Sequence, residues 1–542
     1  MANHHEEKGF LLTAAMLFFV IIAVTTYTQS EEDAFIYYRY AVNWAHGEGF
    51  VFNAGEFVEG YSSPVWMMIL ALIAKLQLNL PLTGPILGIV CGVLTIMATH
   101  FLAVKVELSR FGKAAAILSL AVCYPFIMWS RSGLETPFYS FILVTFAVFY
   151  ISTQYSTPPP QKISIRHQLL GGMGIALVGL SRPEGILLVV VIAIDRFLDD
   201  RDYAGFLRYF LTAVLCYSVF LFWRYCIYGS FMPNTSVKIH PERLVFSVGQ
   251  TLNYFVYLGV LPLVIPLVKL VRKNRQNSAG DKRLTFLILI VLIVSVCYTL
   301  ASGGDYKPFF RFLVPSVPIT MVAFWGSYEA LGFEGRWRFK RIPQTIFRGF
   351  ILICLLFSSA KSIVSQYVRP NLFQATRREW LNPFENTNNY HVIAARWIVD
   401  QIPPNSVVAY GQMGKAPYYA MRQGLDIHFI DTLGLTDKEI GRLYRLDNRI
   451  RMFAQQLISG EHFSVGQARE NAREAVGEQA SQYILKCNPD IIIMESILLK
   501  KNIRFFQILL ANAEFRSNYD LLAMVPSEAT PNFLVYARKN EI

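Results

Sequence analysis

The chain has 542 residues, of which 54% are hydrophobic and only 16% are charged. Soluble domains carry about 25% charged residues, so this deficit excludes an ordinary soluble protein and indicates the bilayer as solvent. The net charge of +12 does not indicate nucleic-acid binding, because much of it lies in short loops between apolar segments, where Lys and Arg report membrane orientation. No CxxC pair occurs, so neither a zinc site nor a disulfide framework is predicted.

The first apolar segment has no small-residue cleavage site after it and is predicted to be a retained anchor. A spanning helix needs roughly 20 mostly apolar residues, fewer where neighbours bury it. We therefore predict about 11 transmembrane helices. The candidate spans are 10–27, 84–105, 114–130, 137–153, 168–181, 184–198, 203–228, 250–271, 284–301, 309–328 and 345–362. The stretch 64–80 is expected not to cross; it reads as a juxtamembrane helix interrupted by Lys75 and stopped by Pro81.

Two basic clusters fix the orientation. One covers Lys269 to Arg283 and the other Arg336 to Arg348, and two spans separate them, so both can face the cytoplasm. By parity, the loop 28–83, the loop 229–249, the loop 302–308 and the tail then lie outside. The multispan domain is expected over 1–362 and an extracytoplasmic domain over 363–542.

The tail has a different pattern. Hydropathy drops, and strand-like runs of β-branched and aromatic residues appear at 406–410, 427–430, 490–494 and 533–536. Segments 390–401, 415–422 and 436–446 between them are predicted helices. Alternating strands and helices over about 180 residues predict one α/β domain.

Three consecutive carboxylates, Glu31, Glu32 and Asp33, open an aromatic-rich helix at the outer membrane boundary. Carboxylates there stay in water or work in a cavity, because their desolvation is costly. Glu31 and Glu32 also suit a plain helix N-terminus, where acids stabilise the dipole. Asp33 is harder to explain in that way, because Phe35, Ile36 and Tyr37 follow it so closely.

The other polar features fall on the same outer surface. A carboxylate can accept a proton from an attacking hydroxyl, and a cationic cluster can hold a phosphate leaving group. The sequence therefore predicts transfer from a lipid-phosphate donor. The cationic residues on this surface are Arg131, Arg182, Lys238, His240, Lys307 and Arg311, and Asp305 adds a further acid.

Motifs spread over nearly the whole chain resemble those of integral-membrane GT-C glycosyltransferases. The first is Glu-Asp-Ala-Phe-Ile-x-Tyr-Arg-Tyr-Ala from Glu32, followed by Val-Glu-Gly-Tyr-Ser-Ser-Pro-x-Trp from Val58. Ser-Arg-Ser-Gly-Leu-Glu-Thr from Ser130, Ser-Arg-Pro-Glu-Gly from Ser181 and Gly-Gly-Asp-Tyr from Gly303 agree with it. The resemblance is nearest to the terminal arabinofuranosyltransferases of arabinogalactan and their bacterial homologues.

The resemblance implies a polyprenyl-phosphate sugar donor and a glycan, lipid or protein acceptor at the outer face of a bacterial inner membrane. It places the family's acidic motif on Glu32 and Asp33, where relatives commonly carry two aspartates. Asp33 is then the expected proton acceptor, or the nucleophile in a retaining reaction. The donor phosphate is expected at Arg131, Arg182, Lys238, Lys307 and Arg311. Substrate is expected at Arg39, Glu59, Tyr61, Asp305 and His240.

No cofactor is expected to be required, although Glu32, Asp33 and Asp305 offer hard oxygen ligands for Mg²⁺ or Ca²⁺. Two other function classes stay open at this stage. A transporter or flippase for lipid-linked sugars would also be polytopic, but two matching halves with broken helices are not evident. An envelope assembly factor with an inactive transferase fold would share every fold-level feature.

Overall fold

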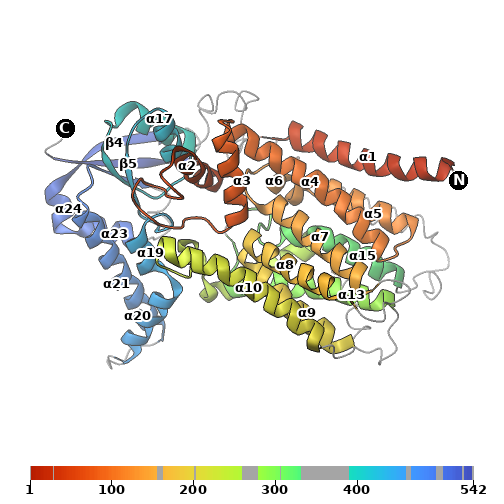
Figure 1. Cartoon of the computed structure of the whole chain (residues 1–542). Coiled ribbons are helices and arrows are strands. Elements are labelled where there is room, and N and C mark those ends of the chain that lie inside the picture. Colours follow the sequence, from red (N-terminus) through yellow and green to blue (C-terminus); the bar gives the residue numbers. More distant parts are fainter. Residues whose placement is uncertain are drawn as a thin grey trace.

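Helices make up most of the described residues up to 330, and a sheet with flanking helices makes up the described residues from 390 onward. The computed structural model describes residues 2–27, 30–155, 163–199, 203–258, 279–305, 307–330, 390–458, 465–495, 504–527 and 530–539. The sheet lies at one end of the molecule, the bundle of long helices at the other, and α2 (Glu32–His46) between them (Figure 1).

The bundle is built mainly from apolar helices. Those of its first half are α1 (Ala2–Thr25), α4 (Leu80–Lys105), α5 (Arg110–Ala121), α6 (Tyr124–Ser130), α7 (Thr136–Gln154) and α8 (Ile165–Ser181). Those of its second half are α9 (Leu188–Asp199), α10 (Tyr203–Tyr228), α11 (Leu244–Tyr257), α13 (Ala279–Leu289), α14 (Tyr298–Ser302) and α15 (Val317–Ala330). A π-helical segment, Ile290–Cys297, joins α13 to α14.

Four of the described helices are long and apolar enough to cross a membrane: Leu80–Lys105, Thr136–Gln154, Tyr203–Tyr228 and Gly280–Ser302. The pair α5 and α6, bent by 55°, makes a fifth if it counts as one span. The predicted number of eleven is therefore not confirmed. The candidate span 345–362 lies outside the described residues, as does the second half of 250–271.

Two proline positions explain where the predicted boundaries were wrong. Pro81 was expected to stop a helix, but it lies in the first turn of α4, where a missing N–H breaks no intrahelical bond. The preceding helix, α3 (Pro64–Lys75), ends at Lys75, which is earlier than the predicted end at Pro81. Pro315 lies in a short 3₁₀ turn, so α15 begins at Val317 and not at residue 309. Residues 307–313 are consequently irregular, which leaves their side chains available to a site.

The tail forms one mixed five-stranded sheet of order β2-β1-β3-β5-β4. Its strands are β1 (Val407–Tyr410), β2 (His428–Asp431), β3 (Ile491–Glu495), β4 (Tyr519–Ser527) and β5 (Thr530–Arg538). β1 pairs in parallel with β2 and β3, whereas β5 is antiparallel to both β3 and β4. Four of these strands coincide with predicted runs, and β4 was missed.

The helices of the tail connect the strands. They are α17 (Tyr390–Gln401), α18 (Lys415–Arg422), α19 (Lys438–Tyr444), α20 (Leu446–Ile458), α21 (Val465–Lys486), α23 (Arg504–Ala511) and α24 (Ala513–Asn518). α17 and α18 have the predicted bounds. The predicted helix 436–446 is shorter, because Asp437 caps α19 through the backbone N–H of Ile440.

Apolar packing joins the tail to the bundle through α2. Phe35 on α2 packs against Tyr418 and Tyr419 of α18, with ring centroids 5.4 Å and 5.5 Å apart. Arg39, also on α2, donates from Nη1 to the carbonyl oxygen of Pro417 at 2.8 Å. One continuous cluster of buried apolar side chains therefore runs from the helices into the sheet.

A buried ion pair ties the outer loop to the end of α10. Arg224 Nε lies 2.7 Å from Glu59 Oε2, and the two side chains are 6% and 2% exposed. Removing one partner of a buried pair leaves the other charge desolvated and uncompensated, which costs far more than the net value of the pair.

We expect Glu59→Ala to lower the free energy of unfolding by about 3 kcal/mol, because the Arg224 guanidinium loses its buried partner. The measurement is thermal unfolding of the detergent-solubilised protein, followed by intrinsic fluorescence. The double variant Glu59→Leu/Arg224→Met is the control and is expected to recover most of the loss. Equal destabilisation in both variants would contradict this account.

Candidate active site

The site is centred on the first turn of α2. Glu31 is the N-cap residue, and Glu32 and Asp33 follow it, so all three acids lie where the helix dipole favours negative charge. Because side chains one residue apart on a helix point in different directions, the three carboxylates face different neighbours. Each therefore has its own partners.

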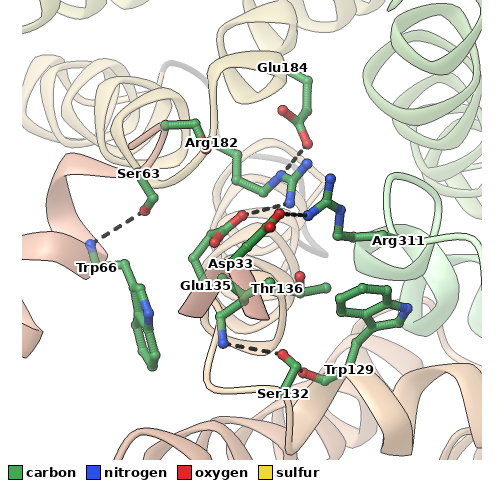
Figure 2. A network of polar contacts seen from close by, with 12 residues as sticks. Asp33, Ser63, Trp66, Trp129, Ser132, Glu135, Thr136, Arg182, Glu184 and Arg311 are labelled. Atoms are coloured by element: carbon green, nitrogen blue, oxygen red, sulfur yellow. Dashed lines mark hydrogen bonds and ion pairs between the residues drawn. The ribbon is translucent and has the colours of Figure 1, made fainter. Parts of the chain in front are cut away.

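Three cations from distant parts of the chain converge on Asp33. Lys238, the last residue of the 3₁₀ turn η2 (Asn234–Lys238), donates from Nζ to Asp33 Oδ2 at 3.2 Å. Arg311 Nη1 lies 3.2 Å from the same oxygen, and Lys307 Nζ lies 3.6 Å from Oδ1. Figure 2 shows the Asp33 carboxylate pointing at the Arg311 guanidinium. The exposed fraction of the Asp33 side chain is 16%.

This surrounding fixes the charge of Asp33. Burial alone would raise the pKa of the Asp33 carboxyl, but Lys238, Lys307 and Arg311 together hold it well below its usual range. Asp33 is therefore an ionised carboxylate across the neutral range of pH.

Two further acids balance the cations. Asp305 Oδ2 accepts from Arg311 Nε at 2.5 Å, and Glu31 Oε1 accepts from Lys307 Nζ. Gln250 holds the backbone of Asp305, accepting from its N–H at 3.0 Å and donating to its carbonyl oxygen at 2.7 Å. Three carboxylates and three cations thus make up this cluster, which carries no net charge.

Arg182 lies beside the cluster but has its own acids. It donates to Glu135 Oε1 at 2.8 Å and to Glu184 Oε1 at 2.5 Å, and all three side chains are buried (Figure 2). The guanidinium groups of Arg182 and Arg311 both lie 5.4 Å from the ring centroid of Phe312. Sequence reasoning missed Glu135 and Glu184, although both stand within the motifs that suggested the site.

Arg131 is bound elsewhere. It donates to the Thr26 hydroxyl at 2.9 Å and to the Tyr124 hydroxyl at 3.0 Å. Neither contact involves a carboxylate of the Asp33 cluster. As a contact for the donor phosphate, Arg131 therefore stays a prediction without support from this geometry.

Glu32 faces the tail and not the three cations. Its Oε1 accepts from the backbone N–H groups of Gly414 at 3.0 Å and Lys415 at 2.8 Å, at the start of α18. Its Oε2 lies 3.7 Å from His391 Nδ1. These contacts favour a structural role for Glu32, where a catalytic one was expected.

Most of the residues expected to bind substrate make polar contacts within the protein. The guanidinium of Arg39 donates to Pro417 and Phe52 carbonyl oxygens, and the Tyr61 hydroxyl lies 2.9 Å from that of Tyr228. Glu59 pairs with Arg224, as described above. Of the five residues, Asp305 alone lies within the Asp33 cluster.

His240 lies at the boundary with the tail. Its Nδ1 is 3.0 Å from Glu242 Oε1 and 2.9 Å from Arg449 Nη1 of α20. Arg449 Nη1 also donates to Glu242 Oε1 at 2.9 Å. This contact joins the loop after α10 to the tail.

The acids do not fit a resident metal ion. Glu32 Oε1 is taken by two backbone N–H groups, and Asp33 and Asp305 share the Arg311 guanidinium between them. Within the described part of the chain, no three His, Cys, Asp or Glu side chains are grouped closely enough to hold a metal. The arrangement instead offers cations to an anionic ligand.

Comparison with known proteins finds solved structures with a similar fold. Residues 381–536 match a family described as a domain of unknown function (DUF8728). No curated protein sequence matches the chain. Among solved structures, the archaeal oligosaccharyltransferase AglB from Archaeoglobus fulgidus has a TM-score of 0.52 at 11% identity, over 99% of this chain and 75% of AglB. ArnT from Cupriavidus metallidurans, in the apo state, has a TM-score of 0.50 at 12% identity, over 99% of this chain and 98% of ArnT.

The chain has the GT-C fold. It is therefore a multi-pass membrane protein. The arabinofuranosyltransferase AftD from Mycobacteria has a TM-score of 0.48 at 12% identity, over 98% of this chain and 41% of AftD. A match at that score carries no argument about the arabinofuranosyltransferases in particular, so that part of the resemblance stays a prediction.

Proposed function

We propose that this protein is a glycosyltransferase that moves a sugar from a polyprenyl-phosphate donor to a hydroxyl of a cell-envelope acceptor. The reaction would take place at the outer face of a bacterial inner membrane, with arabinofuranose as the sugar that the sequence resemblance favours. The observation that carries the proposal is the convergence of Lys238, Lys307 and Arg311 on one partly buried carboxylate, Asp33.

The cations suit a phosphate whose charge grows during the reaction. A sugar linked to a lipid through one phosphate carries one negative charge, and the departing lipid phosphate carries two. Lysine and arginine side chains placed at this group stabilise the charge as it develops. The AglB structure was solved with a dolichol-phosphate, so a protein of this fold binds a lipid phosphate.

Asp33 would act as the proton acceptor. The acceptor oxygen attacks the anomeric carbon and forms the new glycosidic bond, while the bond from that carbon to the phosphate oxygen breaks. The electron pair leaves with the polyprenyl phosphate, and the acceptor's proton passes to the Asp33 carboxylate. Glu32 would hold α18 in place without taking part in the chemistry.

In the unliganded protein, three cations make Asp33 a weak base. A bound phosphate competes with Asp33 for Lys238, Lys307 and Arg311. As those cations turn to the phosphate, they stabilise the Asp33 carboxylate less. Burial then raises the pKa of Asp33, which becomes a stronger base. Donor binding would thereby activate the base.

We expect Asp33→Asn to lower the rate of transfer by about 100-fold or more, because the proton acceptor is lost. Polyprenyl phosphate should bind the variant as tightly as the wild type or more tightly, because no carboxylate competes for the cations. The measurement is transfer of radiolabelled sugar from a panel of polyprenyl-phosphate donors by purified protein, with equilibrium binding of polyprenyl phosphate alongside.

Glu32→Gln is the matched control, because its amide oxygen can still accept from Gly414 and Lys415; it should keep most of the activity. Wild-type turnover in Asp33→Asn would contradict the catalytic role. Donor binding without turnover in the wild type would favour a transporter or an assembly factor.

The pH dependence provides a separate test. In the free protein the pKa of Asp33 is well below its usual range. Protonation of Asp33 should therefore not lower kcat/KM above about pH 4. In the donor complex its pKa rises, so kcat should fall at a higher pH than kcat/KM does. Rates measured from pH 4 to pH 8 check this, and coincident acid limbs would contradict the exchange of cations.

A further inference from the structure

A pocket outside the Asp33 cluster lies where α10, the outer loop and the tail meet. Its volume is about 360 Å³. In Figure 1 the end of α10 lies beside α19, with α21 next to them. The side chains that line the pocket and carry the argument are Glu56, Phe57, Tyr228, Asp437, Lys438 and Tyr483.

The turn η2 connects this pocket to the Asp33 cluster. At one end of η2, Asn234 Nδ2 donates to the carbonyl oxygen of Asp437 at 2.8 Å. At the other end, Lys238 donates to Asp33 at 3.2 Å. A 3₁₀ turn rises about 2 Å per residue, so the two ends lie about 8 Å apart.

The polar groups of the pocket are fixed before any ligand binds. Asp437 Oδ1 accepts from the N–H of Ile440 at 2.9 Å, and the Tyr483 hydroxyl lies 3.4 Å from Asp437 Oδ2. Glu56 Oε2 accepts from Asn53 Nδ2 at 2.8 Å. A carboxylate has about four lone-pair sites, so each can accept further hydrogen bonds in a set position.

The pocket also has an apolar wall. Phe57 is aromatic and yet 47% exposed. The Tyr228 ring is buried, and contacts of its hydroxyl with Tyr61 and with the Phe50 carbonyl oxygen fix its position. Fixed hydrogen-bond acceptors beside aromatic carbon match a sugar ring, which has hydroxyls at its rim and C–H groups on its face.

Charge narrows the ligand class. Glu56 and Asp437 outnumber the single lysine, Lys438, so the pocket repels phosphate and carboxylate groups. Burial raises the pKa of Asp437 to about 6, and the like charges of Asp431 and Glu56 add to the rise. Asp437 is still mostly ionised at neutral pH, and Lys438 offsets part of the negative charge of the two acids.

We propose that this pocket binds a neutral sugar unit of a glycan acceptor, close to the unit that receives the transferred sugar. This inference rests on the proposed function and narrows its acceptor to a glycan. The pocket lies beyond the donor site, so it would set acceptor choice without taking part in the bond exchange.

The test is saturation-transfer NMR of the full-length protein in detergent, with methyl glycosides of neutral pentoses and hexoses as probes. At least one glycoside should bind the wild type. Phe57→Ala and Tyr483→Phe should each weaken that binding about three- to tenfold, the equivalent of one aromatic contact or one hydrogen bond. Leu521→Ala is the matched control, because Leu521 is an apolar side chain of similar exposure, 49%, on β4.

Absence of binding by every glycoside, or equal binding in Phe57→Ala, Tyr483→Phe and the wild type, would overturn the pocket assignment. Displacement of the bound glycoside by inorganic phosphate or butylammonium would also overturn it. Donor cleavage is measured on the same samples. If the wild type cleaves donor but the pocket fails, the proposed function stands; if no donor is cleaved, the proposed function fails, whatever the pocket binds.

Discussion

The contact of three cations with one partly buried carboxylate, Asp33, is the interaction on which the rest of the site depends. Asp33 lies on α2, Lys238 ends η2, and Lys307 and Arg311 lie in the irregular segment before α15. A buried carboxylate without partners would be protonated or would destabilise the fold, so its cations hold these three segments together. The same ion pairs keep the cations in place and ready for an anionic ligand.

The neighbouring carboxylate gives α2 a second role. Glu32 accepts from two N–H groups at the start of α18, and Arg39 and Phe35 extend the contact with the same helix. The tail therefore contacts α2 one residue away from Asp33. In this arrangement α2 contacts both the tail and the proposed reaction centre.

Much of the local structure could be predicted from residue pattern alone. β1, β2 and β3 are short runs of buried apolar residues, and such runs are recognisable without tertiary information. β4 was missed because it is an edge strand on which polar and apolar residues do not alternate. Its residues Asp520, Leu521 and Met524 are all exposed. Lys238, Lys307 and Arg311 were predicted to lie on the same side of the membrane as Asp33, but their contacts with its carboxylate were not predicted.

The choice of partner within the site could not be predicted in the same way. Arg182 and Arg131 were grouped with the other cations because they belong to the same surface. Glu135 and Glu184 neutralise Arg182, and Tyr124 and Thr26 take up Arg131. Such pairing depends on the direction in which each side chain points, over distances of a few ångströms. Neither hydropathy nor the distribution of charges along the chain determines that direction.

The most direct test of the central claim is a cryo-electron microscopy structure of the full-length protein with polyprenyl phosphate. We predict that phosphate oxygens lie within hydrogen-bond distance of Lys238, Lys307 and Arg311, and that Asp33 has lost at least one of these three partners. A phosphate bound elsewhere, with all three Asp33 contacts unchanged, would contradict the account.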